Sequence, residues 1–540
     1  MVNRDKSIFF RRWLWTLLAT LSLICPFRAL AGSYVVSNTN DSGAGSFRQA
    51  ILDLNAAADA ANTITFNTSG TITLASLLDD VNEDVTFVGG SGVKVVLPSV
   101  GGGTNLSGLV MNGGGGTAFN GELPSFEVTG TADGILGVGG PIVEFNDDIS
   151  GTISATAGTD EVYGIYGTLV RISDISGTVS AEAGRNDSIA LVADAILDIT
   201  GDVSGTLTAT SGLDAAAVIG SPDVDIAGDI SGVLTAHAGQ DEAYGISADD
   251  FDLQGNLSGT ISATADRDGA FGFYTTNTLY IRGTLSGTVS ATAGGHTAIG
   301  LFNDTGVING GAVNTALDIS GNVSAEANGL AVGIAAWEAM NLNVTGSISG
   351  VDNSGGGAGY AVRSGRDDWV GGWAGDNNVD DVVQFGNGAF ITGHVDLGGG
   401  TNALGMAGSG SMTGNLLNIN TLDKADSGTW TINGRTAATN LSVAGGTLRM
   451  NNSDAGSPAN TLGGTLTVNN GASMQLDVYQ TAASSLDVTG AATVNGQVVF
   501  VPRALLASGT TFTAMTMASM AGTGQYTAPL FTVDTSSGNS

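Results

Sequence analysis

Apolar and polar residues alternate along short stretches of the chain, and these stretches return about every 27 residues, the spacing of a repeat architecture. From Ile149 to Ala157 the odd positions are apolar or small and the even positions are polar. That is the two-residue period of a β-strand. Two further apolar runs follow, one at Ile165 and one at Val170 and Ile172. The pattern therefore predicts three short strands in each repeat.

Related Ser-Gly phrases mark the starts of the repeats. The step to the last of them is longer than the others, which predicts a loop insertion near Gly310 and Gly311. The phrases begin at Ser150, Ser176, Ser204, Ser231, Ser258, Ser286 and Ser320.

Three short strands per repeat predict an all-β fold, a right-handed parallel β-helix with one repeat per coil. We expect the helix over residues 67–350, most clearly over 148–350. A β-propeller needs blades of about 40 residues, and a leucine-rich repeat needs leucines at fixed places, so neither fits.

The open ends of a solenoid need covers, because they expose unpaired strand edges. Residues 46–61 form the one convincing helical pattern, with Ser46 as the N-cap and Phe47, Ile51 and Leu54 on one face. We expect an N-terminal cap with a first strand over residues 32–66. An irregular transition follows the repeats at 351–409.

The first 31 residues have the pattern of a secretory signal peptide. Arg11 and Arg12 precede an apolar run that ends at Cys25, and Ala29 and Ala31 provide small residues before Gly32. The run is too short to span a bilayer, which needs about 20 residues. Residues 1–31 therefore predict export through the inner membrane, to the cell surface, to the outer membrane or into the medium. The only cysteine, Cys25, would leave with the signal peptide.

A second repeat pattern occupies residues 410–510. Its phrase from Leu422 to Gly434, with Lys424, Thr429 and Trp430, resembles the autotransporter-associated repeat, although Asp426 replaces a glycine of that motif. The opening residues 37–55 also resemble the start of many bacterial surface β-helix proteins.

These resemblances imply the passenger region of a Gram-negative autotransporter, an adhesive or structural stalk. The family's translocator barrel is an expected partner, but residues 511–540 form only a tail without the long series of strands that such a barrel needs.

Charge narrows the choice of partners. The chain carries a formal net charge of −33, and residues 1–31 contain more basic than acidic groups. An acidic surface repels nucleic acid and anionic lipid. Glycans or proteins of a host or a neighbouring cell remain the expected partners.

Candidate catalytic residues are few. Four adjacent aspartate pairs occur, but neighbouring residues of a strand point to opposite faces, so each pair suits a solvated turn better than a catalytic dyad. We therefore expect no enzymatic activity. The alternative is a polysaccharide lyase or hydrolase, which would need at least three convergent carboxylates, or carboxylates with arginine, on one coil face. The pairs are Asp147–Asp148, Asp249–Asp250, Asp367–Asp368 and Asp380–Asp381.

One acidic series suggests a metal. Aspartates recur at a constant interval, and stacked carboxylates repel each other unless they are splayed, hydrated or bridged by cations. This predicts weak Ca²⁺ binding, with no other cofactor, while the alternative is that aspartate simply suits turns. The series is Asp160, Asp187, Asp214, Asp241 and Asp268, and a parallel one runs Asp148, Asp174, Asp202, Asp229 and Asn256.

Overall fold

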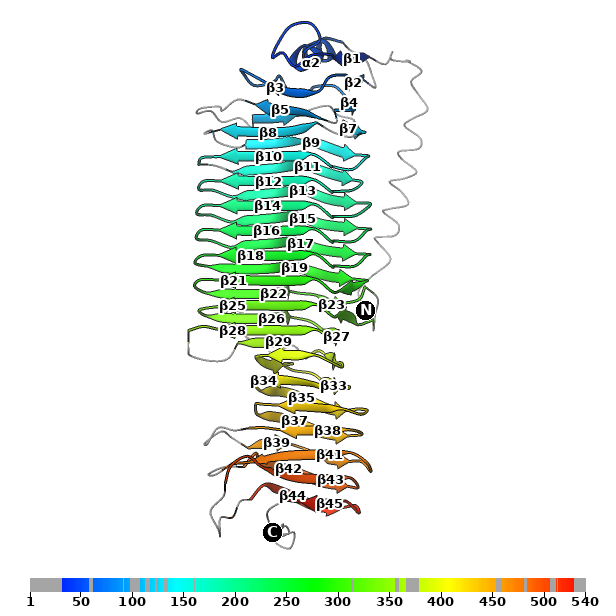
Figure 1. Cartoon of the computed structure of the whole chain (residues 1–540), viewed down its shortest axis with the longest axis vertical. Coiled ribbons are helices and arrows are strands. Elements are labelled where there is room, and N and C mark those ends of the chain that lie inside the picture. The colour runs from blue at the N-terminus through cyan, green and yellow to red at the C-terminus, as the bar shows by residue number, and fades with distance from the viewer. Residues whose placement is uncertain are drawn as a thin grey trace.

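The structure is a computed structural model that shows a parallel β-helix whose coils stack along one axis (Figure 1). Consecutive coils pair in parallel: β10 (Thr152–Ala157) lies beside β12 (Thr178–Ala183), with Ile153 opposite Val179. The structure describes residues 32–57, 62–90, 92–97, 107–111, 117–121, 124–130, 135–159, 161–311, 315–354, 359–365, 378–452, 459–479, 483–505, 511 and 513–528.

The coils over residues 152–281 contain two strands rather than the three that we predicted, whereas the coil over residues 322–344 contains three. The apolar runs at Ile165 and at Val170 belong to one strand of 11 residues, β11 (Val162–Ile172). Its alternation breaks where Gly164 and Ile165 are both buried. The strand continues past this point and keeps its pairing to the next coil, with one irregularity between Gly167 and Leu169. A single bridge between Ile149 and Ile175 adds one more contact at the following corner.

Two series of strands therefore run the length of the molecule. One series contains the short strands β3 (Gly70–Thr73), β5 (Val93–Leu97), β8 (Ser125–Gly130), β10, β12, β14 (Thr206–Ser211), β16 (Val233–Ala238), β18 (Thr260–Ala265), β21 (Thr288–Ala293), β25 (Asn322–Ala327), β28 (Ser347–Asp352), β31 (Phe390–Thr392), β34 (Gly410–Thr413), β36 (Thr429–Ile432), β38 (Thr447–Met450), β41 (Ser473–Val478), β43 (Gln497–Pro502) and β45 (Gln525–Thr527).

The other series contains the long strands and the shorter pieces that replace them: β1 (Ser33–Val36), β2 (Asn62–Phe66), β4 (Val85–Val88), β6 (Ser107–Val110), β7 (Thr117–Asn120), β9 (Ile135–Phe145), β11, β13 (Ser188–Ile199), β15 (Ala216–Ile226), β17 (Ala243–Leu253), β19 (Gly269–Ile281), β20 (Thr284–Leu285), β22 (Thr297–Asn303), β23 (Val307–Asn309), β24 (Leu317–Ile319), β26 (Leu330–Ala336), β27 (Asn341–Val344), β29 (Tyr360–Ser364), β30 (Val382–Phe385), β32 (His394–Asp396), β33 (Ala403–Met406), β35 (Leu416–Lys424), β37 (Thr436–Val443), β39 (Asn460–Leu462), β40 (Leu466–Val468), β42 (Leu486–Val494) and β44 (Met515–Ala521).

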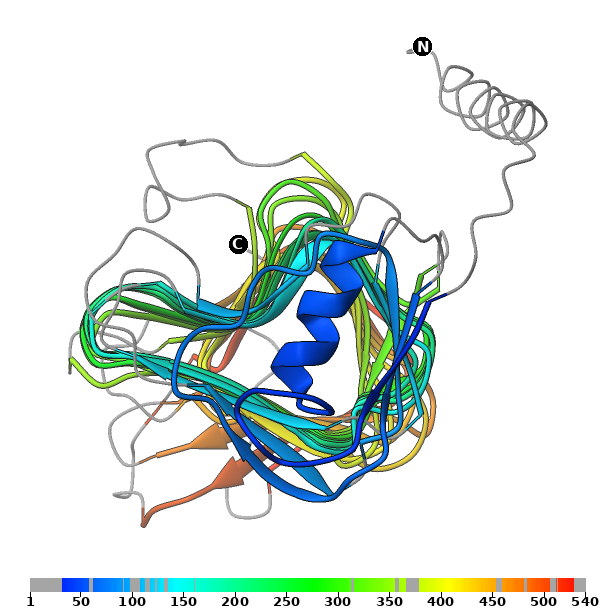
Figure 2. The same cartoon turned by 90° about the horizontal axis from the view of Figure 1, so that it is seen from above.

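The predicted helix lies across the N-terminal end of the coils (Figure 2). It is α2 (Phe47–Ala56), and the Ser46 hydroxyl accepts a hydrogen bond from the Gln49 N–H at 3.2 Å. Phe47 is buried against Phe66, with ring centroids 5.1 Å apart. Residues 58–61 of the predicted helix lie outside the described residues.

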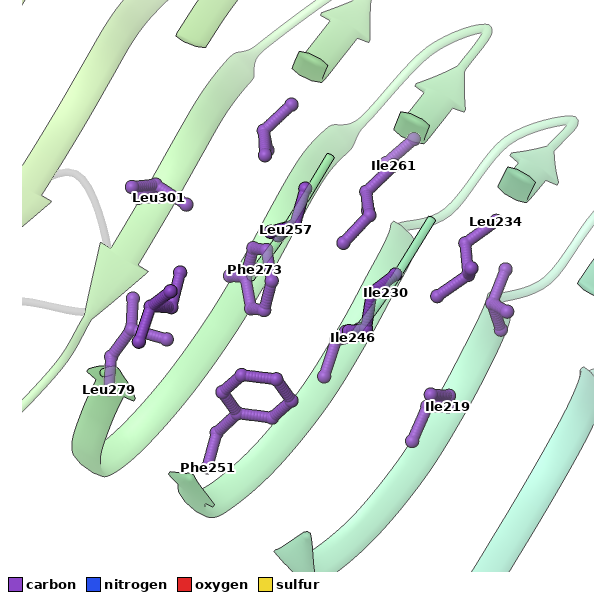
Figure 3. Close-up of a cluster of buried hydrophobic side chains, with 14 of the residues drawn as sticks. Ile219, Ile230, Leu234, Ile246, Phe251, Leu257, Ile261, Phe273, Leu279 and Leu301 are labelled. Carbon is purple, nitrogen blue, oxygen red and sulfur yellow. The ribbon is translucent and has the colours of Figure 1, made fainter. Parts of the chain in front are cut away.

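The core consists of ladders of identical or similar side chains. Inward residues of successive coils, such as Ile219, Ile246 and Phe273, lie one above another and are fully buried (Figure 3). Each such residue stabilises the fold by about 1.5–3 kcal/mol when it leaves water. A coil cannot bury its apolar side alone, so the stacking itself creates the core.

Coil length divides the β-helix into two sections. In the long-coil section, residues 148–350, partners on neighbouring coils are commonly 27 or 28 residues apart. In the short-coil section, residues 378–505, the separation falls to 18 or 20 residues at several places. The described part of the predicted transition at 351–409 contributes regular rungs, since β30 pairs with β27 and β33. The predicted insertion falls between β23 and β24, where the Gly310 N–H donates to the Thr315 carbonyl, and residues 312–314 lie outside the described residues.

Residues of the repeat phrase at 422–434 are structural. The Lys424 side chain is fully buried and its ammonium donates to the carbonyl of Asp426 at 3.0 Å. The fully buried Trp430 donates from Nε1 to the Ala407 carbonyl at 2.9 Å. Asp426 has φ +48°, the left-handed region that glycine adopts readily, and the motif has glycine at this position. The contacts of these motif residues therefore stabilise a corner of the coil.

Candidate functional site

The aspartates predicted to hold Ca²⁺ do not form one straight ladder. Asp160 lies outside the described residues. Asp187 is level with Ala215, because Ser188 pairs with Ala216, and its Oδ1 accepts from the Ala215 N–H at 3.0 Å. One coil of 28 residues causes this shift, so Asp187 lies one position away from Asp214.

The positions of the other aspartates do not test the Ca²⁺ hypothesis, which stays a prediction. Burial raises the pKa of Asp187, and the nearby charges of Asp214 and Glu161 add to this. Over the described ranges, no three His, Cys, Asp or Glu side chains gather in a metal-binding arrangement. A thermal scan with Ca²⁺ and with a chelator checks the hypothesis, and an unchanged midpoint would contradict it.

The parallel series of aspartates connects one coil to the next. Asp174 Oδ1 accepts from the Asp202 N–H at 2.8 Å, and Asp202 Oδ1 accepts from the Asp229 N–H at 2.7 Å. Asn256 continues the series, with the Thr284 N–H donating to its Oδ1. These carboxylates satisfy backbone donors at a corner, so their role is structural.

Carboxylates also stack on the outer face of the long strands. Asp198, Asp225 and Asp252 occupy one register position on successive coils, and Asp223 pairs with Asp250 two residues earlier. Burial raises the pKa of Asp225, and Asp223, Asp252 and Asp198 raise it further. Sequence reasoning missed this cluster, although Asp-x-Asp recurs at 223–225 and 250–252 with strand spacing.

Several of these carboxylates already have partners in the protein. Arg282 holds Asp252 with two nitrogens, at 2.7 Å from Nε and 2.5 Å from Nη2. The Thr278 hydroxyl donates to Asp250 at 2.6 Å. Much of the cluster thus ties neighbouring coils together.

In the predicted aspartate pairs that the structure describes, the side chains bond to separate partners and do not form a dyad. Asp249 accepts from the Thr276 hydroxyl at 2.6 Å and Asp380 from the Thr401 N–H at 2.7 Å. Asp381 is fully buried, accepts from the Met340 N–H at 2.7 Å, and has its pKa raised by burial to about 6. The pair at 367–368 lies outside the described residues.

Another feature of the outer surface is a set of largely apolar side chains, which sequence reasoning did not predict. Two ladders of outward residues, which we name the outer aromatic stripe, follow the bend of the long strands from coil to coil. The first ladder is Leu136, Tyr163, Ile189, Ala217, Tyr244, Phe271, Ile299, Val332, Tyr360 and His394. The second is Gly139, Tyr166, Val192, Gly220, Ser247, Tyr274, Phe302, Ala335, Arg363 and Asp396.

The two ladders converge although they come from opposite sides of the bend. The rings of Tyr163 and Tyr166 are 5.5 Å apart, and those of Phe271 and Tyr274 are 5.4 Å apart. Residues three apart in a straight strand point to opposite faces, so the strand must bend toward the outside here. Phe271 and its neighbours form a buried cluster separate from the core. The sequence contains a pattern that could have indicated the stripe: two large residues three positions apart with a glycine after the first, as in Tyr163 and Tyr166.

Comparisons with known proteins add no family to this picture, since no family model, no curated protein and no solved structure matches the chain. Fold and surface together define the class, a parallel β-helix protein with an acidic exterior and an apolar stripe outside its core. None of the helices in the described part of the chain is long and apolar enough to cross a membrane.

Proposed function

We propose that this protein is an exported β-helical stalk of the autotransporter-passenger type, which works by binding partners along its outer surface and not by catalysis. The signal-peptide pattern predicted at residues 1–31 and the resemblance of the repeat phrase around Lys424 and Trp430 support this proposal. One observation carries the binding role. The outer aromatic stripe places partly exposed rings such as Tyr163 and Tyr244 outside the core, and exposed apolar patches of this kind are typical of surfaces that bind partners.

Two measurements test this proposal. N-terminal sequencing of the protein made in a Gram-negative host should begin at Gly32, and the product should be accessible to protease added outside the cell. An array of glycans and matrix proteins probed with residues 32–540 should give at least one ligand. A chain retained in the cytoplasm, or one that binds nothing on the array, would overturn the proposal.

A second function is favoured by the stacked carboxylates. Asp225, whose pKa burial raises, occupies the same register position as Asp198 and Asp252 on the neighbouring coils, and glycosidic bonds are cleaved by pairs of carboxyl groups in different surroundings. Incubation with a panel of polysaccharides, followed by assays for new reducing ends and for unsaturated sugars, tests it. Activity that disappears in Asp225→Asn would establish a hydrolase or lyase in place of the non-catalytic stalk.

A further inference from the structure

The upper part of the outer aromatic stripe, from Tyr163 to Tyr244, differs from the lower part. Lower down, Phe271, Tyr274 and Phe302 pack on one another and fill the bend with their own rings. Higher up, Tyr163, Ile189 and Tyr244 remain partly exposed. The ring of Tyr244 stacks on Phe271 below it, with centroids 5.4 Å apart, and the buried Ala217 lies between Tyr244 and Ile189. The upper part therefore offers apolar surface that no ring of the described chain covers completely.

A ligand that lies along the stripe meets side chains and not free backbone. The backbone N–H and C=O groups of these rungs are bonded to the coils above and below, as in the pairing of β13 with β11 and β15. A peptide laid over this surface would leave its own amides against apolar side chains without partners, at a cost in free energy. A chain of pyranose rings has apolar C–H faces for stacking and keeps its polar groups at the ring edge.

Carboxylates border the upper part. Glu161, Asp187 and Glu242 each stand two residues before a residue of the first ladder. Burial raises the pKa of Tyr163 and of Tyr244, and the nearby charges of Glu161 and Asp187 at Tyr163 and of Glu242 at Tyr244 add to it. The Tyr163 hydroxyl donates to Glu161 at 3.0 Å, and on the other border the Tyr166 hydroxyl donates to Asp194 at 2.7 Å. Burial raises the pKa of Glu242, with the charges of Asp241 and Asp268 as further causes. The borders therefore concentrate negative charge, which an amine of the ligand would neutralise.

The stripe already contains one cation–π contact within the protein. At its lower end the Arg363 guanidinium lies over the ring of Tyr360, 4.3 Å from the centroid. Tyrosine faces attract cations of the protein and of ligands alike.

We propose that the outer aromatic stripe between Tyr163 and Tyr244 binds a linear polysaccharide of amine-bearing sugars. The sugar rings stack on Tyr163, Ile189 and Tyr244, and the ammonium groups face the carboxylates of Glu161, Asp187 and Glu242. This inference rests on the proposed binding function and names its ligand class.

Calorimetric titration of residues 32–540 tests the inference. The probes are a linear glucosamine oligomer at mildly acidic pH, where its amines are protonated, its fully N-acetylated form, and an oligolysine of equal charge. Tyr163→Leu keeps the bulk of the side chain but loses the ring, and Glu242→Gln removes one charge. Each should weaken glucosamine binding about tenfold. Tyr280→Leu alters an outward tyrosine away from the stripe and should leave the affinity unchanged. Circular dichroism confirms that each variant is folded.

Each outcome decides one question. Glucosamine binding that depends on Tyr163 and Glu242 but not on Tyr280 supports the inference. Equal affinity for the acetylated oligomer overturns the role of the amines, and stronger binding of oligolysine overturns the polysaccharide. Binding of array ligands that is unaffected by Tyr163→Leu overturns the stripe as the site while the binding function stands. Absence of any ligand on the array overturns that function as well.

Discussion

The long-coil and short-coil sections differ in whether charged side chains are buried inside them. Among the described residues of the long-coil section, the buried polar side chains are uncharged, as with Thr275 and Asn303. The short-coil section buries Asp381, Lys424 and Asp477 completely. A coil of about 27 residues encloses enough apolar side chains to form a core by repetition alone. The short-coil section adds the contacts of these buried ionic groups to its apolar core, so single residues should be more critical there.

The largest expected effect is at Asp477, which two arginines surround. Arg449 donates from Nη2 at 2.5 Å and Arg503 lies 2.9 Å away through Nε. Asp477→Asn leaves two guanidinium groups without their counter-charge, and we expect the free energy of unfolding to fall by about 3 kcal/mol. This is less than for a fully buried ion pair, because both arginines are partly exposed. Hydrogen exchange over residues 447–502 measures it. Asp423→Asn, an exposed change in the same section, should have no effect, and equal protection in both variants would contradict the comparison.

The next effect is a pH dependence at Asp381. Its pKa is raised from 3.8 in the unfolded chain to about 6 in the folded protein. The folded state therefore binds more protons in this window, so stability falls as pH rises from about 4 to about 6, by about 2 kcal/mol. Unfolding measured across this range should show the fall. Asp381→Asn should abolish the fall and Asp380→Asn should retain it, whereas a fall that persists in Asp381→Asn would point to another group.

The smallest effect is expected at the corners of the long-coil section. Asp202→Ala removes the acceptor of the Asp229 N–H, which solvent can partly replace, so we expect a loss of about 1 kcal/mol. Chemical denaturation with Asp241→Ala as an exposed control measures the difference. A loss as large as that of Asp477→Asn would contradict the claim that this section depends little on single charges.

Much of the fold could be predicted from the sequence, because the same position recurs in every coil. Alternation placed residues such as Ile153 in the core, and Ser46 marked the start of α2. The merging of two predicted strands into β11 could not be foreseen, since a break in alternation at Gly164 and Ile165 looks the same whether a strand bends or ends.

The candidate site was harder to predict than the fold. To predict the outer aromatic stripe one must know which side chains face outward, and a shift of one residue in register would exchange the outward Ala217 with Val218 of the core. The Asp187 prediction was affected in the same way, because one longer coil shifted it away from Asp214.

The proposed site depends on the register in which Ile189 lies beside Ala217 on the next coil. A pair of introduced cysteines tests this register directly. The chain has no cysteine after Cys25, so the Ile189→Cys, Ala217→Cys variant of residues 32–540 contains only the introduced thiols. Neighbouring rungs are about 4.8 Å apart, within the range that a disulfide spans. We expect rapid cross-linking in this pair and little in Ile189→Cys with Val218→Cys, whose side chains point to opposite faces. The reverse preference would place the stripe inside the core and contradict the account.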